Sequence, residues 1–185
     1  MSKICKVWID AGHGGSDSGA VAGGLIEKAI NLTVALELIR LLEEAGFLVG
    51  ATRKTDVFVG LTERCNMANR WGAQLFLSIH HNAGGGDGYE AIHSIGHGLG
   101  DDFAAAIVAE FAALGQNPHG SHPVYSKEGQ HGDYFAVIRQ THMPAVISEF
   151  AFLDSKDASA IDSQAEQMAE ARALFNAICK VAQSS

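Results

Sequence analysis

The chain has 185 residues, of which 47% are hydrophobic and only three are proline, so its length and composition favour one compact domain, and we expect no second one in this sequence. Its 13 basic and 21 acidic residues give a formal net charge of −8, which excludes non-specific attraction to nucleic acid or to an anionic membrane surface. No apolar run approaches the roughly 18 residues that a membrane-spanning helix needs.

The cysteines and the first residues concern the compartment in which the chain is made. Cys5, Cys65 and Cys179 are odd in number and contain no C-x-x-C pair, so we expect buried free thiols rather than disulfides or a thiolate zinc site. Residues 1–5 lead directly into a strand, without the apolar segment and cleavage site of a secretion signal. We therefore expect synthesis in the cytosol without a signal peptide.

The first predicted element is a strand that ends in a glycine-rich turn. Residues 4–9 form a short apolar run with little alternation, which is typical of a strand in a parallel sheet covered on both faces. The turn that follows, Gly12-His13-Gly14-Gly15, places His13 at the carboxyl end of this strand. In open α/β sheets, ligands and catalytic groups collect at that edge.

The remaining elements alternate between helix and strand. Residues 28–45 carry apolar side chains at helical spacing, and Gly46 ends that helix. We predict further strands at 47–52, 75–79, 89–94, 134–138 and 145–148, and further helices at 61–71, 101–114 and from about 160 to 182. This order predicts a single three-layer α/β domain, with a mostly parallel twisted sheet of about six strands and helices on both faces.

Two segments are predicted to lack regular structure. Residues 116–132 are polar, contain Pro118 and Pro123, and are interpreted as a long loop that borders a site. Residues 183–185 are interpreted as a tail or the start of a linker, so the domain spans residues 1–182.

Four positions put metal-binding or acid-base side chains where elements end or begin. They are His13, the pair His80 and His81 after strand 75–79, Glu149 at the end of strand 145–148, and Glu27 at the start of the first long helix. A carboxylate in the apolar run around Glu149 is costly to bury unless it is paired, hydrogen-bonded or near a metal. An ion pair with Arg139 is the structural alternative for Glu149, and the helix dipole alone accounts for an acidic residue at position 27.

Two imidazoles and one carboxylate make a set suited to Zn²⁺, which leaves a fourth position for water. A second carboxylate then serves as the base for that water, which is the equipment of a hydrolase. The glycine-rich turn is a poor phosphate loop because no Lys-Ser or Lys-Thr follows it, and Asp17 stands where a dinucleotide fingerprint has its third glycine.

Several blocks together resemble the zinc-dependent N-acetylmuramoyl-L-alanine amidases of the type 3 class, from Val7 to about Leu153. The resemblance implies zinc on His13, Glu27 and His80, with Glu149 as the catalytic acid and base, and it selects His80 over His81. It also implies the fold predicted above. The blocks are Ile9-Asp10-Ala11-Gly12-His13-Gly14-Gly15, Asp17-Ser18-Gly19-Ala20, Glu27-Lys28, Thr52-Arg53, Leu61-Thr62-Glu63-Arg64, Ala68-Asn69, Ser78-Ile79-His80-His81-Asn82-Ala83, and Met143-Pro144-Ala145-Val146 before Glu149.

The reaction that the resemblance implies is hydrolysis of the amide between N-acetylmuramic acid and L-alanine in peptidoglycan. Asn82 is a candidate substrate contact, although an Asn that ends a strand is also ordinary turn chemistry. Where relatives often carry Asn-Arg-Gly, this chain has Asn117-Pro118-His119-Gly120, so an arginine contact to substrate is missing. A second metal site or a proton relay is an alternative for the additional histidines, but we expect them to be scattered on the surface; they are His81, His119, His122 and His131.

Two alternatives stay open, a zinc peptidase that acts on stem peptides and a catalytically inert wall-binding module. We expect a monomer that acts at the cell wall, either as a phage endolysin released at lysis or as the catalytic domain of a secreted autolysin. The net charge of −8 predicts poor retention on anionic walls, and hence either a separate wall-binding module in the full-length chain or a loose association with the wall.

Overall fold

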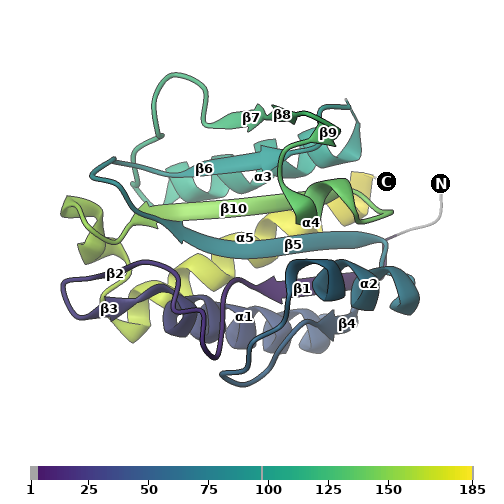
Figure 1. The fold of residues 1–185 in the computed structure, drawn as a ribbon, viewed down its shortest axis with the longest axis horizontal. Coiled ribbons are helices and arrows are strands. Elements are labelled where there is room, and N and C mark those ends of the chain that lie inside the picture. Colours follow the sequence, from purple (N-terminus) through teal and green to yellow (C-terminus); the bar gives the residue numbers. More distant parts are fainter. Residues whose placement is uncertain (1–3, 97, 185) are drawn as a thin grey trace.

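A computed structural model of the chain, which describes residues 4–96 and 98–184, contains a six-stranded central sheet (Figure 1). In spatial order the strands are β4 (Leu48–Ala51), β1 (Lys6–Ala11), β5 (Leu75–Asn82), β10 (Ala145–Phe152), β6 (Glu90–His93) and β7 (Val124–Ser126). The first four strands across the sheet are mutually parallel; β6 runs antiparallel to β10, and β7 runs parallel to β6. The predicted mostly parallel sheet is therefore confirmed.

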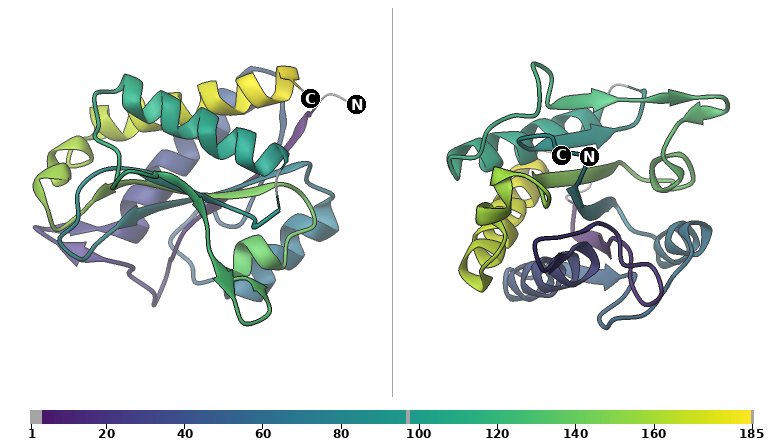
Figure 2. Two further views of the ribbon diagram at one scale, coloured as in Figure 1. Left: turned by 90° about the horizontal axis from the view of Figure 1, so that it is seen from above. Right: turned by 60° about the vertical axis from the view of Figure 1, so that its left-hand side comes forward.

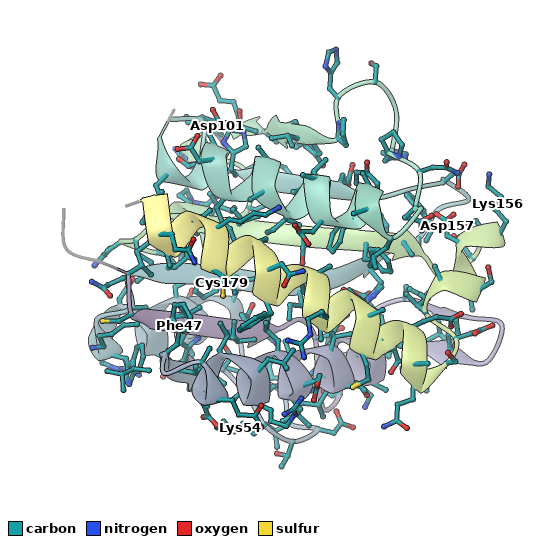
Figure 3. All side chains as sticks on the ribbon, turned by 180° about the vertical axis from the view of Figure 1, so that it is seen from behind. Phe47, Lys54, Asp101, Lys156, Asp157 and Cys179 are labelled. Atoms are coloured by element: carbon teal, nitrogen blue, oxygen red, sulfur yellow. The ribbon has the colours of Figure 1, made fainter. Side chains whose placement is uncertain are left out.

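Helices cover both faces of this sheet, as predicted (Figure 2). One face carries α1 (Glu27–Glu44), α3 (Leu99–Ala113) and α5 (Gln164–Ser184), and the other carries α2 (Leu61–Trp71) and α4 (Ala136–Arg139). Seen from behind, α5 lies between α1 and α3 (Figure 3). None of the described helices is both long enough and apolar enough to cross a membrane.

Alternation along the strands divides the core into two clusters. Ile9 and Leu77 pack in the larger cluster with α1, α3 and α5, whereas Trp8 and Phe76 pack in the smaller cluster with α2 and α4. Because side chains alternate between faces along a strand, neighbours at the end of β5 also point to opposite faces. His80 belongs to the face of α2 and α4, and His81 to the face of α1 and α5.

Two of the predicted elements are wrong. The run 134–138 is not a strand: its apolar residues Val137 and Ile138 belong to the short helix α4, which packs on α2. Short apolar runs carry no period that separates a strand from a buried helical turn. The sixth strand comes instead from the predicted loop 116–132, which contains β7 and, with Asp133, the small ribbon of β8 (Glu128–Gly129) and β9 (Gly132–Asp133).

The structure also contains elements that were not predicted. A hairpin of β2 (Val21–Ala22) and β3 (Leu25–Ile26) leads into α1, and the 3₁₀ helix η1 (Lys156–Ala160) precedes α5. Helix α5 continues through Ser184 and so includes residues 183 and 184, and Ser185 lies outside the described residues; the domain boundary at residue 182 stays a prediction.

All three cysteines are free, as predicted, but only Cys65 is buried. Cys5 is exposed, and Cys179 on α5 is half-buried (Figure 3).

Candidate metal and catalytic site

The structure brings His13, Glu27 and His80 together at the carboxyl ends of β1 and β5. One ligand atom from each lies within 4.8 Å of the others, and this is the single such group found among the described residues. Glu27 Oε1 lies 3.1 Å from His13 Nε2 and 3.0 Å from His80 Nδ1. Donor atoms bound at zinc distances in a tetrahedron are about 3.3 Å apart, so the spacing fits one small cation.

The backbone of the glycine turn aims His13 at this point. His13 has a φ of 58°, the left-handed conformation that residues with a side chain seldom adopt. A Cβ atom at Gly12 would lie 2.3 Å from the His80 ring, and one at Gly19 would lie 2.4 Å from Glu27 Oε2. Glycine at these two positions therefore lets the chain pass close to the two other ligands.

Two buried arginines hold the turn in place, and the sequence prediction gave them no role. Arg64 donates to Asp10 Oδ1 at 2.9 Å and to the carbonyl oxygen of His13 at 2.7 Å. Arg53 donates to the carbonyl oxygens of Ala11 and Gly12 at 3.0 and 2.8 Å. Both arginines occur in sequence blocks that carry the family resemblance, and this was the one signal available. A hydrogen bond to a backbone carbonyl group leaves no pattern in the sequence.

Asp17 is a further residue whose role the sequence prediction missed. Its Oδ2 lies 2.8 Å from His13 Nδ1, so it accepts a hydrogen bond from the ring nitrogen that faces away from Glu27. A carboxylate in this position fixes the tautomer and the orientation of a ligating histidine. Its position four residues after a histidine is the signal that was available.

Both carboxylate oxygens of Glu27 have hydrogen-bond partners. It is the first residue of α1 and is 4% exposed, and its Oε2 accepts a hydrogen bond of 2.9 Å from the backbone of Ala20. Burial raises the pKa of Glu27, but hydrogen bonds from His13 and His80 outweigh it and keep this pKa well below the usual range. The carboxylate is therefore ionised, as a metal ligand must be.

Glu149 lies on the neighbouring strand β10, directly opposite His80 in the register, and its Oε2 is shielded from solvent without a hydrogen-bond partner among the described residues. Burial, with Glu27, Glu90 and Glu170 nearby, raises the pKa of Glu149 well above its ordinary value. The alternative ion pair with Arg139 is not formed, because that guanidinium donates to the carbonyl oxygens of Asp133 and Tyr134.

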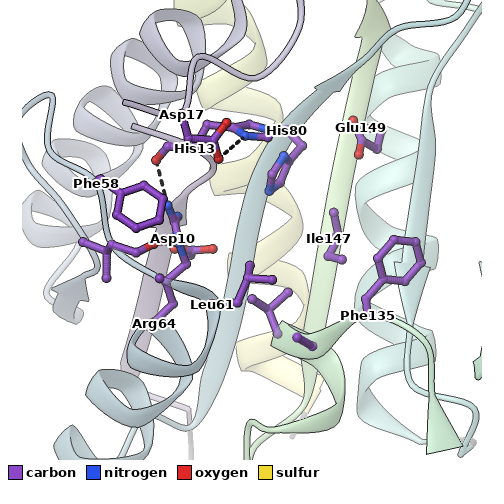
Figure 4. A pocket seen from close by; sticks show the side chains of 14 residues that line it. Asp10, His13, Asp17, Phe58, Leu61, Arg64, His80, Phe135, Ile147 and Glu149 are labelled. Carbon is purple, nitrogen blue, oxygen red and sulfur yellow. Dashed lines mark hydrogen bonds and ion pairs between the residues drawn. The ribbon is translucent and has the colours of Figure 1, made fainter. Parts of the chain in front are cut away.

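A cavity of about 310 Å³ lies between the two histidines of this group and Glu149 (Figure 4). His13, His80 and Glu149 line it together with apolar side chains, and Phe58 and Phe135 stand on opposite sides of it in Figure 4. The arrangement combines a set of cation ligands, a carboxyl group with a raised pKa and a partly apolar wall. This is the composition of a hydrolytic pocket.

The other predicted residues lie apart from this cavity. Asn82 is not among its lining residues and donates to Glu90 Oε1 at 3.0 Å, so a substrate contact through Asn82 stays a prediction. The expectation of surface histidines holds for His122 and His131, which are exposed, but His119 is half-buried and His81 is buried. The described residues contain no second metal group among these histidines.

Comparisons with known proteins agree with this geometry. A family model described as N-acetylmuramoyl-L-alanine amidase matches residues 7–180. The chain is 39% identical over 180 residues to N-acetylmuramoyl-L-alanine amidase CwlM of Bacillus licheniformis, covering 96% of this chain and 68% of the relative. It is 35% identical over 187 residues to the endolysin of Bacillus phage SPP1, covering 94% of this chain and 64% of that protein.

Among solved structures, N-acetylmuramoyl-L-alanine amidase AmiC2 of Nostoc punctiforme superimposes with a TM-score of 0.84 at 29% identity, covering 96% of both chains. The chain thus spans about two thirds of the two sequence relatives and nearly all of this structure.

Proposed function

Because the chain belongs to the N-acetylmuramoyl-L-alanine amidase family, we propose that it hydrolyses the amide between N-acetylmuramic acid and L-alanine in peptidoglycan, with one zinc ion as cofactor. The observation that carries this proposal is the convergence of His13, Glu27 and His80 on one point, with Glu149 across the same cavity. Zinc held by such ligands polarises a carbonyl group and makes water a better nucleophile at neutral pH.

The chain's own residues supply the proton transfers. Glu149 accepts a proton from the attacking water as the new C–O bond forms, and returns it to the alanine nitrogen as the C–N bond breaks. Burial raises the pKa of Glu149, which makes its carboxylate a stronger base toward the attacking water than an exposed glutamate is. Asp17 keeps the His13 ring in place through its Nδ1 hydrogen bond.

The location and partners follow from the same proposal. The relatives are named as amidases and as an endolysin, so we infer that this chain acts at the bacterial cell wall on peptidoglycan. Its formal charge of −8 disfavours retention on anionic wall polymers, and we therefore still predict a separate wall-binding module. The monomeric state also stays a prediction.

Product analysis tests the proposed reaction. Purified peptidoglycan is digested with the zinc-loaded chain, and with a sample treated with chelator as the control. New amino groups on L-alanine, together with muramic acid freed of its peptide, support the amidase. An amino group freed on another stem residue identifies a zinc peptidase instead, and binding without release identifies an inert wall-binding module; either result overturns the proposal.

A further inference from the structure

A chain of buried polar side chains lies behind the proposed zinc site, on the opposite face of β5 from His80. Asn31 of α1, His81 of β5 and Glu170 of α5 are 0%, 2% and 0% exposed. They stand where α1 and α5 pack on the sheet, among apolar residues of the larger core cluster. Polar groups in such a place are costly unless they bond to one another, so their contacts are informative.

Asn31 contacts all three segments that supply the proposed ligands. Its Nδ2 donates to Glu27 Oε1 at 3.3 Å and to the Gly12 carbonyl oxygen, next to His13, at 3.2 Å. Its Oδ1 lies 2.8 Å from His81 Nδ1. Because the amide nitrogen faces two oxygens, the amide cannot be flipped without losing both bonds, and His81 Nδ1 must be the donor to Oδ1.

Glu170 holds the other side of the His81 ring. Its Oε2 lies 3.0 Å from His81 Nε2, and both side chains are 0% exposed. The second oxygen of Glu170 has no hydrogen-bond partner in the described part of the chain, so His81 is the partner that compensates its burial. With Nδ1 committed to Asn31, this pair keeps the ring from rotating.

The same assembly also reaches Glu27 through the backbone. The His81 N–H donates to Glu27 Oε1 at 3.3 Å, so this oxygen receives bonds from both His81 and Asn31. It is the oxygen that faces His13 Nε2 and His80 Nδ1. The buried side chains thus act on one atom of the ligand set.

We infer that Glu170, His81 and Asn31 are positioning residues that fix the Glu27 carboxylate before the metal binds and thereby set the affinity for zinc. The inference rests on the proposed function, because it assigns Glu27 as a ligand. A carboxylate that is already oriented loses little freedom on binding a cation, whereas a loosened one must be ordered at that moment. Residues that form hydrogen bonds to a metal ligand typically contribute tenfold to hundredfold to the metal affinity.

The test is a zinc titration of the purified full chain against a competing chromophoric chelator. Asn31→Ala should weaken zinc binding about tenfold to hundredfold. Asn176→Ala is the matched control, because Asn176 of α5 also donates to a carboxylate, Glu110 Oε2 at 2.9 Å, but away from the site. Thermal unfolding of the metal-free forms shows the temperatures at which both variants stay folded, and the zinc affinities are compared only there, because Asn31 is buried and Asn176 is half-buried.

A second pair of variants keeps the test valid if Asn31→Ala does not fold. Glu170→Ala should weaken zinc binding, whereas Glu170→Gln should restore it, because glutamine still offers a partner to His81 Nε2. Unchanged zinc affinity in Asn31→Ala and Glu170→Ala, with a wild-type chain that binds zinc, overturns this inference alone. A wild-type chain that binds no zinc overturns the proposed metal site as well.

Discussion

Glu27 and Glu149 lie in one site, yet their surroundings differ. Glu27 has partners at both oxygens, from His13, His80, Ala20 and Asn31, and its pKa is held low. Glu149 has an oxygen that is shielded from solvent and has no hydrogen-bond partner in residues 4–96 and 98–184, and burial raises the pKa of Glu149.

The difference separates two roles for the same functional group. A carboxylate with every lone pair engaged keeps its charge and its position, as a metal ligand must. A carboxyl group that lacks partners gains and loses a proton readily, as an acid-base catalyst must. The following predictions test this division.

Glu149→Gln gives the largest expected effect. Removing the proton acceptor should lower kcat by about 10²- to 10⁴-fold, the usual contribution of a general acid-base group. Zinc content should stay near that of the unmodified chain, because Glu149 is not in the ligand group. Rates of peptidoglycan release and metal analysis of the same samples measure the two. Substantial activity in this variant would remove Glu149 as the base.

Arg64→Ala should have the next largest effect, a loss in the free energy of unfolding, because Arg64 holds the glycine turn that carries His13. Arg64 and Asp10 are 4% and 1% exposed at their side chains, and removing one partner of a buried pair costs about 3–5 kcal/mol. Chemical denaturation measures this loss. Arg70→Ala is the control on the same helix, because its pair with Glu63 is exposed and should contribute less than about 1 kcal/mol. Equal losses in the two variants would show that the Arg64 contacts do not hold the turn.

Asp17→Asn should have a moderate effect on zinc affinity, through the orientation of His13. Asp17 accepts from His13 Nδ1 through Oδ2 and from the Gly19 backbone through Oδ1, and one amide oxygen cannot replace both acceptors. We expect zinc affinity to fall about tenfold to hundredfold. Asp56→Asn serves as the control, because Asp56 bonds to Gly15 in the same turn without touching His13. A chelator titration that separates the two variants supports the assignment, and identical affinities contradict it.

Much of the fold and of the candidate site could be predicted, because buried parallel strands appear as apolar runs and their carboxyl ends share an edge. His13, Glu27 and His80 follow from that rule and from the family resemblance. The contacts of Asn31, His81 and Glu170 could not be predicted, since His81 and Glu170 are 89 positions apart and meet only when α5 packs on the sheet. Helix α4 was missed because a short apolar run fits either a strand or a helical turn.

The smallest expected effect concerns the stability of the metal-free protein, and it follows from the direction in which folding shifts the pKa of Glu149. Its pKa is higher in the folded than in the unfolded chain, so the folded chain binds more protons between the two values. The free energy of unfolding should therefore fall as pH rises above about 4.3, the ordinary pKa of a glutamate.

Glu149→Gln lacks this charge and should be more stable by about 1 kcal/mol at neutral pH, with the difference vanishing in acid. Denaturation curves of both proteins with chelator present, measured across this pH range, would show it. A variant that is equally stable at every pH would mean that the carboxylate of Glu149 is compensated in solution, and the contrast with Glu27 would then rest on the ligand geometry alone.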